Sequence, residues 1–289
     1  MIHDIGQILS SDGTILLKMW EVSVEPGERP FRKHSHIRFE ISKVLAGSGV
    51  YRLSDREVPI SLGDIMIFSS NEPHCITSVG KDGLKLLNLH FEPRYLWGKA
   101  PDSLSEENIG LCFSHCKSFQ NKLQIANTSN ICILLESIQT ELAQGNDEYS
   151  LAVKSYLNLL LILLIREHGY QPATDSFDHD RTAPVRKVIN HIDRHLSDPL
   201  TLTQLSTIAG MSPNYFSTLF YSVSGIRLWD YINSRRFDAA IRLLMEENFT
   251  ILDIATQCGF NNTANFNKTF KKITGMTPSE YRKSGEYML

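Results

Sequence analysis

Imidazole and carboxylate side chains cluster in the first third of this chain. His34 and His36 are two residues apart, Glu40 follows four residues later, and Pro73-His74 adds a third imidazole. Residues two apart on a strand share a face, so the first two histidines can act on one ligand. Two chemistries suit this set. One is coordination of a divalent transition metal, as in a metal-dependent enzyme, and the other is hydrogen bonding in a small-molecule pocket.

Further polar and aromatic side chains accompany this set. An aromatic face beside polar groups suits a sugar, although an aromatic side chain serves equally well in a core. The expected neighbours are Trp20, Arg38, Tyr51 and His90. Cys112, His115 and Cys116 have the residue types of a metal site, but no second ligand pair accompanies them. We interpret these three as incidental.

Short strands must position these residues. Apolar or alternating runs of strand length are separated by clusters of Gly, Pro, Asp and Ser, and this rhythm predicts an antiparallel barrel or jelly roll. The expected strands are Ile15–Val24, Glu40–Ala46, Gly49–Leu53, Ile65–Ser69 and Leu84–Phe91.

A helical segment follows the predicted strands. Apolar residues recur at helical spacing from about residue 130, and a second helix covers residues 151–168 with apolar side chains on more than one face. Such helices pack both on their own domain and on a partner, which predicts a homodimer. Residues 171–184 lack periodic apolar residues and are the expected linker. The predicted domains are therefore residues 1–170 and 185–289.

Composition and charge limit the class of protein. A chain of 289 residues suits two domains. Residues 185–289 carry a net charge of +3 and residues 1–184 one of −6, which is compatible with a C-terminal part that binds nucleic acid. The longest apolar run, Leu159–Ile165, is too short to span a membrane, and the N-terminus has no secretory pattern. The five cysteines are scattered, so we expect reduced thiols and a cytoplasmic protein without membrane contact.

The last third of the chain contains an internal repeat. Each copy has a short apolar-periodic helix, a turn at a glycine and a second helix, which is the pattern of a helix-turn-helix unit. A long helix over about residues 230–246 joins the copies. The alternative, a helical bundle with no nucleic-acid role, does not explain two tandem copies with matching glycines and aromatics. The matched residues are Thr201 with Thr250, Gly210 with Gly259, Phe216 with Phe266, Phe220 with Phe270, Gly225 with Gly275 and Tyr231 with Tyr281.

The stretch from about Leu200 to Arg282 resembles the AraC family of bacterial transcription regulators. Residues 205–220, 254–260 and 266–282 carry the resemblance most densely. More loosely, the His34-Ser-His36 and Glu40 set, with Gly63-Asp64 and Pro73-His74, resembles the cupin motifs of the sensor domain common in this family. The resemblance implies an α+β protein. A cupin-like antiparallel β-barrel with a helical dimerisation segment would precede an all-α tandem helix-turn-helix domain.

The resemblance also implies what the N-terminal domain does. Sensors of this family commonly keep the histidine pattern while binding a sugar or another small effector without metal. We therefore expect effector binding, with a sugar as the candidate, and no metal, cofactor or catalytic residue. The sequence contains no catalytic triad, phosphate-binding glycine loop or nucleotide fingerprint, which argues against an enzyme. The expected effector-binding residues are His34, His36, Arg38, Glu40, Tyr51, His74 and His90.

In this family the exposed face of each second helix reads the bases of double-stranded DNA. Short amides and hydroxyls suit adenine or several bases, and lysine suits guanine. Lysines and arginines near the helix end suit phosphates, which position the protein without specifying sequence. The resemblance implies base contacts from Asn214, Ser217 and Thr218 in the first copy, base contacts from Thr263, Asn265, Asn267 and Lys268 in the second, and phosphate contacts from Lys271, Lys272 and Arg282. RNA polymerase is a candidate further partner.

One departure from the family separates the two copies. Tyr221 and Ser222 stand where the family often has basic residues, so we expect the first unit to bind phosphate more weakly than the second. Three functions remain open. We favour a regulator controlled by a small-molecule effector over a metal-dependent cupin enzyme fused to a DNA-binding module. The third is a constitutive DNA binder whose N-terminal domain only dimerises.

Overall fold

In this computed structural model the chain divides into two compact units: the first contains residues 1–31 and 38–175, and the second contains residues 32–37 and 176–289. The predictions for Cys112, His115, Cys116 and Gly225 concern residues outside the described ranges. The structure describes residues 2–10, 15–27, 34–70, 72–96, 118–123, 129–171, 179–224, 226–244 and 249–284.

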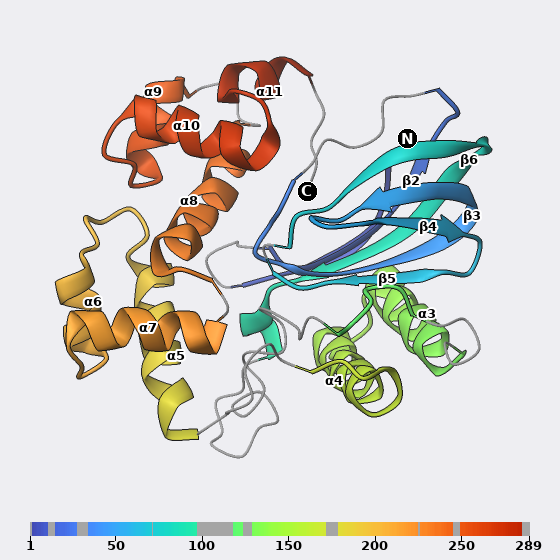
Figure 1. Cartoon of the computed structure of the whole chain (residues 1–289), viewed down its shortest axis with the longest axis horizontal. Coiled ribbons are helices and arrows are strands. Elements are labelled where there is room, and N and C mark those ends of the chain that lie inside the picture. Colours follow the sequence, from blue (N-terminus) through green and yellow to red (C-terminus); the bar gives the residue numbers. More distant parts are fainter. Residues whose placement is uncertain are drawn as a thin grey trace. The chain divides into compact units, whose positions relative to one another are not determined.

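The first unit is built on a six-stranded sheet in the order β1-β2-β6-β3-β4, with β5 paired to β3 (Figure 1). All the strand pairs are antiparallel, as the sequence predicts. The strands are β1 (Ile2–Leu9), β2 (Ile15–Val24), β3 (Phe39–Arg52), β4 (Glu57–Ser61), β5 (Ile65–Phe68) and β6 (Cys75–Phe91).

Side chains alternate between the two faces of this sheet, because successive residues of a strand point to opposite sides. One face carries Leu17, Phe39 and Leu89, which share a core with the helices that follow the sheet. The other face carries Trp20 and Leu86 within a second core, and we call it the inner face. The alternation therefore gives one sheet two separate cores.

The strand boundaries differ from the sequence prediction at one cluster of glycines. The prediction ends a strand before Gly47 and begins another at Gly49, whereas β3 runs through both. Register shifts against β6 between Val44 and Ala46 and between Gly47 and Gly49 absorb the irregularity as bulges. Gly47 has φ of +73°, and a Cβ there would meet the backbone of Gly83. Gly47 and Gly49 therefore belong to β-bulges within one strand and not to a turn between two strands.

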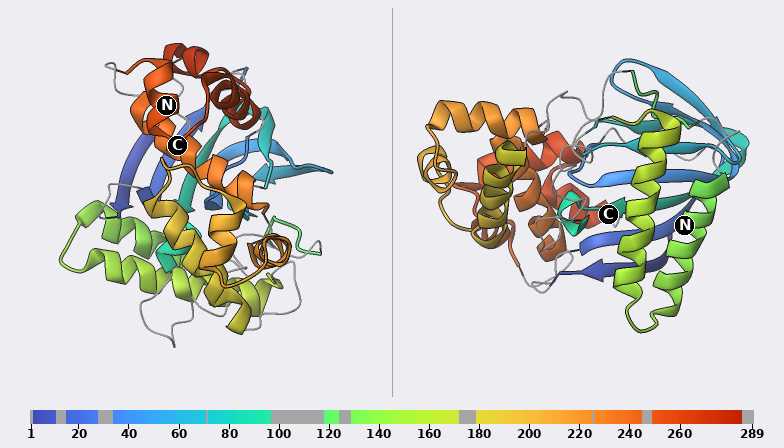
Figure 2. Two further views of the ribbon diagram at one scale, coloured as in Figure 1. Left: turned by 90° about the vertical axis from the view of Figure 1, so that its left-hand side faces the viewer. Right: turned by 90° about the horizontal axis from the view of Figure 1, so that it is seen from below.

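Two helices cover the face opposite the inner face. They are α3 (Ser129–Gln144) and α4 (Tyr149–His168), close to the predicted positions. Figure 2 shows them side by side across the strands, and a short 3-10 helix, η1 (Pro93–Leu96), contacts α4. Among the described residues, α4 alone is long and apolar enough by composition to pass as a membrane span, yet Val153, Leu157 and Leu160 on it are buried within the protein.

From residue 179 to residue 284, all the regular elements described in the second unit are helices, and they include the two predicted helix-turn-helix copies. Its first helix begins at His179, inside the range predicted as linker, because this polar stretch forms a helical turn without needing apolar periodicity. The helices are α5 (His179–Arg194), α6 (Leu202–Ile208), α7 (Pro213–Ser224), α8 (Leu228–Leu244), α9 (Ile251–Gln257), α10 (Thr263–Thr274) and α11 (Pro278–Ser284). The copies are α6–α7 and α9–α10.

Threonine caps begin the short helices of both copies. Thr201 accepts a hydrogen bond from the backbone of Gln204, and Thr250 forms a complete capping box with Asp253. The turns that follow contain Gly210 at φ +70° and Gly259 at φ +77°, a conformation that favours glycine.

The matched phenylalanines of both copies are buried. Phe216, Phe220, Phe266 and Phe270 are each 0% exposed, so they pack the units and do not stack on a partner. Phe220 of the first copy contacts Tyr231, and Phe270 of the second copy contacts Phe237, so α8 supplies core residues to both copies.

Candidate functional site

Strand register places two rows of polar residues on the inner face. In the first row Lys18, His90, Glu40 and Phe68 are cross-strand partners on β2, β6, β3 and β5. In the second row Trp20, Asn88, Ser42 and Met66 occupy the next positions on the same face. Alternation explains why His90 and Asn88 lie together, since they are two residues apart on β6.

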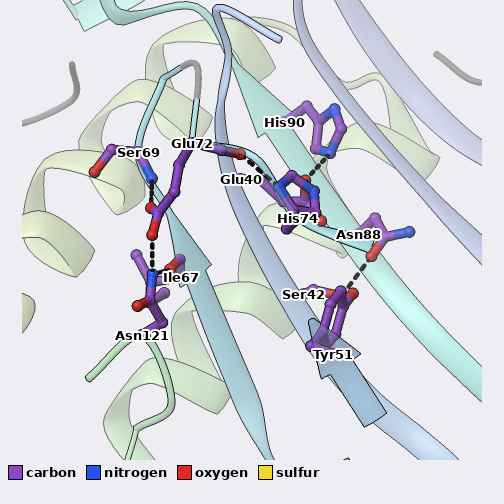
Figure 3. Close-up of polar contacts among 10 residues, drawn as sticks. All are labelled: Glu40, Ser42, Tyr51, Ile67, Ser69, Glu72, His74, Asn88, His90 and Asn121. Carbon is purple, nitrogen blue, oxygen red and sulfur yellow. Dashed lines mark hydrogen bonds and ion pairs between the residues drawn. The ribbon is translucent and has the colours of Figure 1, made fainter. Parts of the chain in front are cut away.

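Glu40 is the centre of the first row. Its Oε2 lies 3.0 Å from Nε2 of His74 and 3.0 Å from Nε2 of His90, and the three side chains are almost wholly buried (Figure 3). Nδ1 of His74 lies 2.8 Å from the carbonyl oxygen of Glu72, so this nitrogen carries a proton. Nε2 lies within ion-pair distance of the Glu40 carboxylate, which favours the protonated form of His74.

The pKa directions of the two histidines agree with this assignment. Burial disfavours charge on His74, but the Glu40 carboxylate and the contacts with Glu72 together raise its pKa above the ordinary value. Burial lowers the pKa of His90, and the charges of Arg38 and His74 add to that effect against the attraction of Glu40. The Glu40 carboxylate thus faces one imidazole whose pKa is raised and one whose pKa is lowered.

A hydrogen-bond relay occupies the second row. Oγ of Ser42 donates to Oδ1 of Asn88 at 2.7 Å and lies 3.1 Å from the hydroxyl of Tyr51. Since the single proton of Ser42 goes to Asn88, the Tyr51 hydroxyl is the donor to Ser42. Burial and the charge of Glu40 raise the pKa of Tyr51 above its ordinary value, which keeps that proton in place.

The segment that presents His74 is held by its own contacts. Glu72 accepts hydrogen bonds from the backbone of Ser69 at 3.0 Å and from Nδ2 of Asn121 at 2.7 Å (Figure 3). The His74 ring also stacks on Phe68, with ring centroids 4.1 Å apart. These contacts fix the imidazole against the sheet.

The structure brings together four of the seven residues predicted to bind an effector, namely Glu40, Tyr51, His74 and His90. Arg38 is buried, and its charge acts on His90. His34 and His36 are half-buried and belong to the short segment, residues 32–37, that groups with the second unit.

Sequence reasoning missed Ser42 and Asn88. Their relay joins β3 to β6 across 46 residues of chain, and spacing along the sequence does not reveal it. The alternation of side chains along each strand could have indicated these two residues. Asn88 and His90 share a face of one strand, as do Ser42 and Glu40 of another.

The residues predicted to contact DNA lie on the second helix of each copy. On α7, Asn214, Ser217 and Thr218 are exposed. On α10, Asn265 and the three lysines Lys268, Lys271 and Lys272 are exposed, whereas Thr263 and Asn267 are half-buried. The Asn267 side-chain oxygen is itself buried.

Two further features of the second unit were not expected. Tyr215 and Tyr221 are 49% and 55% exposed, which gives α7 an aromatic surface in addition to its small polar residues. Arg282 of α11, for which the sequence predicts a phosphate contact, donates to the carbonyl oxygens of Leu244 at 3.2 Å and Phe249 at 2.9 Å. Its guanidinium ties the second copy together.

This fold and these two sites define a DNA-binding protein with an attached ligand-binding domain. Residues 25–161 match the AraC-like ligand-binding domain, and residues 205–284 match a helix-turn-helix domain. The chain belongs to the AraC family of transcription regulators.

Similar proteins agree with this assignment. The uncharacterised regulator YfiF of Bacillus subtilis is 26% identical over 253 residues, which cover 86% of this chain and 78% of YfiF. The probable regulator LumQ of Photobacterium leiognathi is 25% identical over 70% of this chain and 93% of its own. The structure of ToxT from Vibrio cholerae aligns with a TM-score of 0.62 over 92% of this chain and 98% of its own, at 15% identity. This last similarity concerns the fold alone.

Proposed function

We propose that this protein is a sequence-specific regulator whose binding to DNA depends on a small-molecule effector. The observation that carries the proposal is the pair of helices α7 and α10, which present exposed polar residues at matching places in two tandem copies. The second helix of such a unit enters the major groove. Two copies on one chain address successive segments of the groove, about one helical turn apart. We therefore expect the protein to act in the cytoplasm.

Base reading falls mainly to α10 in this proposal. Asn265 and Lys268 are exposed near the start of this helix, where a recognition helix meets base edges. Lys271 and Lys272 follow in its last turn and suit phosphates. Asn214, Ser217 and Thr218 on α7 supply neutral contacts to the adjoining segment.

The effector is assigned to the inner face of the sheet. Several buried polar side chains converge there, and burial of so many polar groups is costly unless each finds a partner. ToxT has been solved with an unsaturated fatty acid bound, so a protein with this fold can take a small molecule. A sugar is the class that the sequence alone suggests.

A second copy of the chain is the proposed partner of α3 and α4. Ile133, Leu151 and Leu159 are 58%, 62% and 50% exposed, which is unusual for large apolar side chains. A homodimer through this surface would cover them, and sedimentation of the whole chain tests its mass. Contact with RNA polymerase stays a prediction from the family.

The experiment that tests this function selects duplexes from a random DNA library with the purified chain. Asn265→Ala and Lys268→Ala are compared with Lys81→Ala, which removes the same charge from an exposed position on β6. We expect a motif with two elements about one turn apart, in which the α10 variants alter one element. The Lys81→Ala control should select the unaltered motif.

Two outcomes of this selection would contradict the proposed function. If no motif is enriched with or without added small molecules, sequence-specific binding is wrong. If a motif is enriched equally under all conditions, the protein is the constitutive binder that the sequence left open.

A further inference from the structure

The glycine turns of the two helix-turn-helix copies share a backbone conformation but differ in their surroundings. Gly210 and Gly259 have φ of +70° and +77°. Among the described residues, a Cβ at Gly210 would meet no atom within 4 Å. A Cβ at Gly259 would lie 2.5 Å from the carbonyl oxygen of Leu196 and 2.9 Å from Cα of Ser197. The turn of the second copy therefore lies directly against the backbone of these two residues.

The segment at this contact belongs to the first copy. Residues 195–200 connect α5 to α6, and α5 contacts both α6 and α7. We call these residues the connecting loop. The backbone N–H of Asp198 donates to the carbonyl oxygen of His195, and Nδ1 of His195 lies 2.9 Å from Oδ2 of Asp198. The contact with Gly259 thus joins the two copies directly, in addition to their connection through α8.

Arg236 of α8 fills the space beside this contact. It is 7% exposed, and its Nε and Nη2 donate to the carbonyl oxygens of Leu196 and Asp198, each at 3.0 Å. The donors of a guanidinium form a rigid planar fork, so two carbonyl oxygens of one loop hold it in a single orientation. Arg236 therefore holds α8 against the connecting loop.

The same guanidinium reaches the second copy. Its central carbon lies 6.0 Å from the centre of the Phe260 ring, a cation–π distance, and its Nη2 would lie 3.0 Å from a Cβ at Gly259. The Phe260 ring in turn packs on Phe266 of α10, with ring centroids 5.0 Å apart. A chain of contacts thus leads from the connecting loop through Arg236 to the second helix of the second copy.

The two ends of α8 are anchored to different copies (Figure 1). Nε of Arg235 lies 2.8 Å from Oδ1 of Asp193 on α5, and the two side chains are only 4% and 6% exposed. Separating such a pair would leave charges unpaired in the interior, so it tolerates little displacement. Further along α8, Ala240 and Leu244 share a core with α9 and α10. These contacts leave α7 and α10 little freedom to move relative to each other.

We propose that Arg236 and Gly259 set the spacing of the two DNA elements that this protein recognises. They hold the connecting loop of the first copy against the turn of the second, and this fixes α7 and α10 at one separation. The inference rests on the DNA-binding function proposed above and adds a determinant of specificity outside the two recognition helices. Arg236 is a positioning residue, because it acts through this geometry and not by contact with DNA.

A fixed separation favours one spacing of the elements over all others. Once one copy is bound, binding of the other is an intramolecular step, whose gain is lost when the geometry prevents both from engaging. One added base pair moves an element by about 3.4 Å along the duplex axis and turns it by about a tenth of a helical turn. A rigid pair of copies cannot follow this displacement, whereas a loosened pair can.

The test measures the affinity of the whole chain for duplexes built on the selected motif. One series changes the spacing between the elements by one or two base pairs in either direction. A further duplex keeps the element read by α10 and scrambles the other. Positioning is lost when affinity falls for the intact motif alone, whereas general damage to the protein weakens binding to every duplex by the same factor.

Five variants separate the contact from its surroundings. Arg236→Met removes both hydrogen bonds at similar volume, and Arg236→Lys keeps the charge without the planar fork. Gly259→Ala places a Cβ against Leu196, and Gly210→Ala makes the same change at the equivalent turn, where the described residues leave room. Arg194→Met removes a charge from an exposed position on α5. Circular dichroism checks that each variant folds.

We expect Arg236→Met and Gly259→Ala to weaken binding to the intact motif by about tenfold and to the single-element duplex by less than about twofold. Both should also discriminate less between spacings, and Arg236→Lys should lie between Arg236→Met and the original chain. Gly210→Ala and Arg194→Met should keep the full preference for one spacing.

A second measurement does not use DNA. Spin labels on non-canonical amino acids at Tyr221 of α7 and Lys271 of α10, both exposed, report the separation of these helices by pulsed electron paramagnetic resonance. We expect one narrow distance distribution for the original chain and for Gly210→Ala. The distribution should broaden in Arg236→Met and in Gly259→Ala.

Three results would overturn the proposal. If Arg236→Met folds and keeps either the full spacing preference or the narrow distance distribution, the contact does not set the spacing. If the original chain binds all spacings equally, its two copies are not held at one separation, although DNA binding stands. If the original chain selects no motif, the function proposed above is wrong and the inference about spacing falls with it.

Discussion

The second helix of each helix-turn-helix copy is closed by the same contact. In the first copy the Ser224 hydroxyl donates to the carbonyl oxygens of Phe220 at 2.6 Å and Ile226 at 3.0 Å. In the second copy the Thr274 hydroxyl donates to Phe270 at 2.9 Å and Met276 at 3.1 Å. The two copies therefore share even the hydroxyl group that closes the second helix.

The surfaces on this shared scaffold differ in charge. A step of 50 residues relates Thr218 to Lys268 and Tyr221 to Lys271. The first copy therefore presents a hydroxyl and an aromatic ring where the second presents two ammonium groups. The two copies therefore keep one fold with different surfaces, and this difference is the basis of our prediction that they divide the work of binding DNA unequally.

The largest expected effect tests the shared scaffold. Phe216→Ala and Phe266→Ala each remove a ring that is 0% exposed, so each should lower the free energy of unfolding by about 3–5 kcal/mol. Chemical denaturation of the whole chain measures both. Phe216→Leu and Phe266→Leu are the matched milder changes. A large loss in one copy and none in the other would show that the packing is not equivalent.

A smaller effect tests the division of work. On the selected duplex, Lys268→Ala should weaken binding by about 1–3 kcal/mol, because it removes a charged contact to base or phosphate. Thr218→Ala, at the equivalent place, should weaken it by less, since a neutral hydroxyl is lost. Fluorescence anisotropy at one salt concentration compares them. Equal losses would contradict an unequal division.

The smallest effect concerns the caps. Thr250→Ala breaks a complete capping box and should cost about 1 kcal/mol of stability, whereas Thr201→Ala breaks a single hydrogen bond and should cost less. Thermal unfolding measures the order. The hydrogen bonds from Thr250 hold the pKa of the Asp253 carboxyl below its ordinary value. The contribution of this carboxylate to stability is therefore fully present above the pKa that Asp253 has in the unfolded chain. It is lost as pH falls through the lower pKa that Asp253 has in the folded protein.

The sequence predicts what local patterns encode. The strand Ile15–Val24 has the predicted bounds because alternation and flanking turns define it, and the internal repeat locates both helix-turn-helix copies. β1 and β4 were missed, since many of their residues are exposed and give no apolar pattern. β3 was divided in two because glycines that form bulges have the composition of a turn.

Only part of the candidate effector site could be predicted from the sequence. Glu40 and the histidines were found by their residue type and spacing. Asn88 and Ser42 acquire their role from the register between β3 and β6, which depends on the whole sheet. Residue types can indicate a site. The hydrogen bonds between side chains on different strands then decide which atoms of the site are available to a ligand.

The most direct test of the unequal division is the salt dependence of DNA binding by two reciprocal variants. Each lysine that neutralises a phosphate adds about 1 to the slope of log affinity against log salt. We predict that Lys271→Tyr lowers the slope by about 1 and that Tyr221→Lys raises it by about 1. If Tyr221→Lys leaves the slope unchanged, the first copy does not approach phosphate at that position. If variants of both copies lower the slope equally, the two units share the charge and the account is wrong.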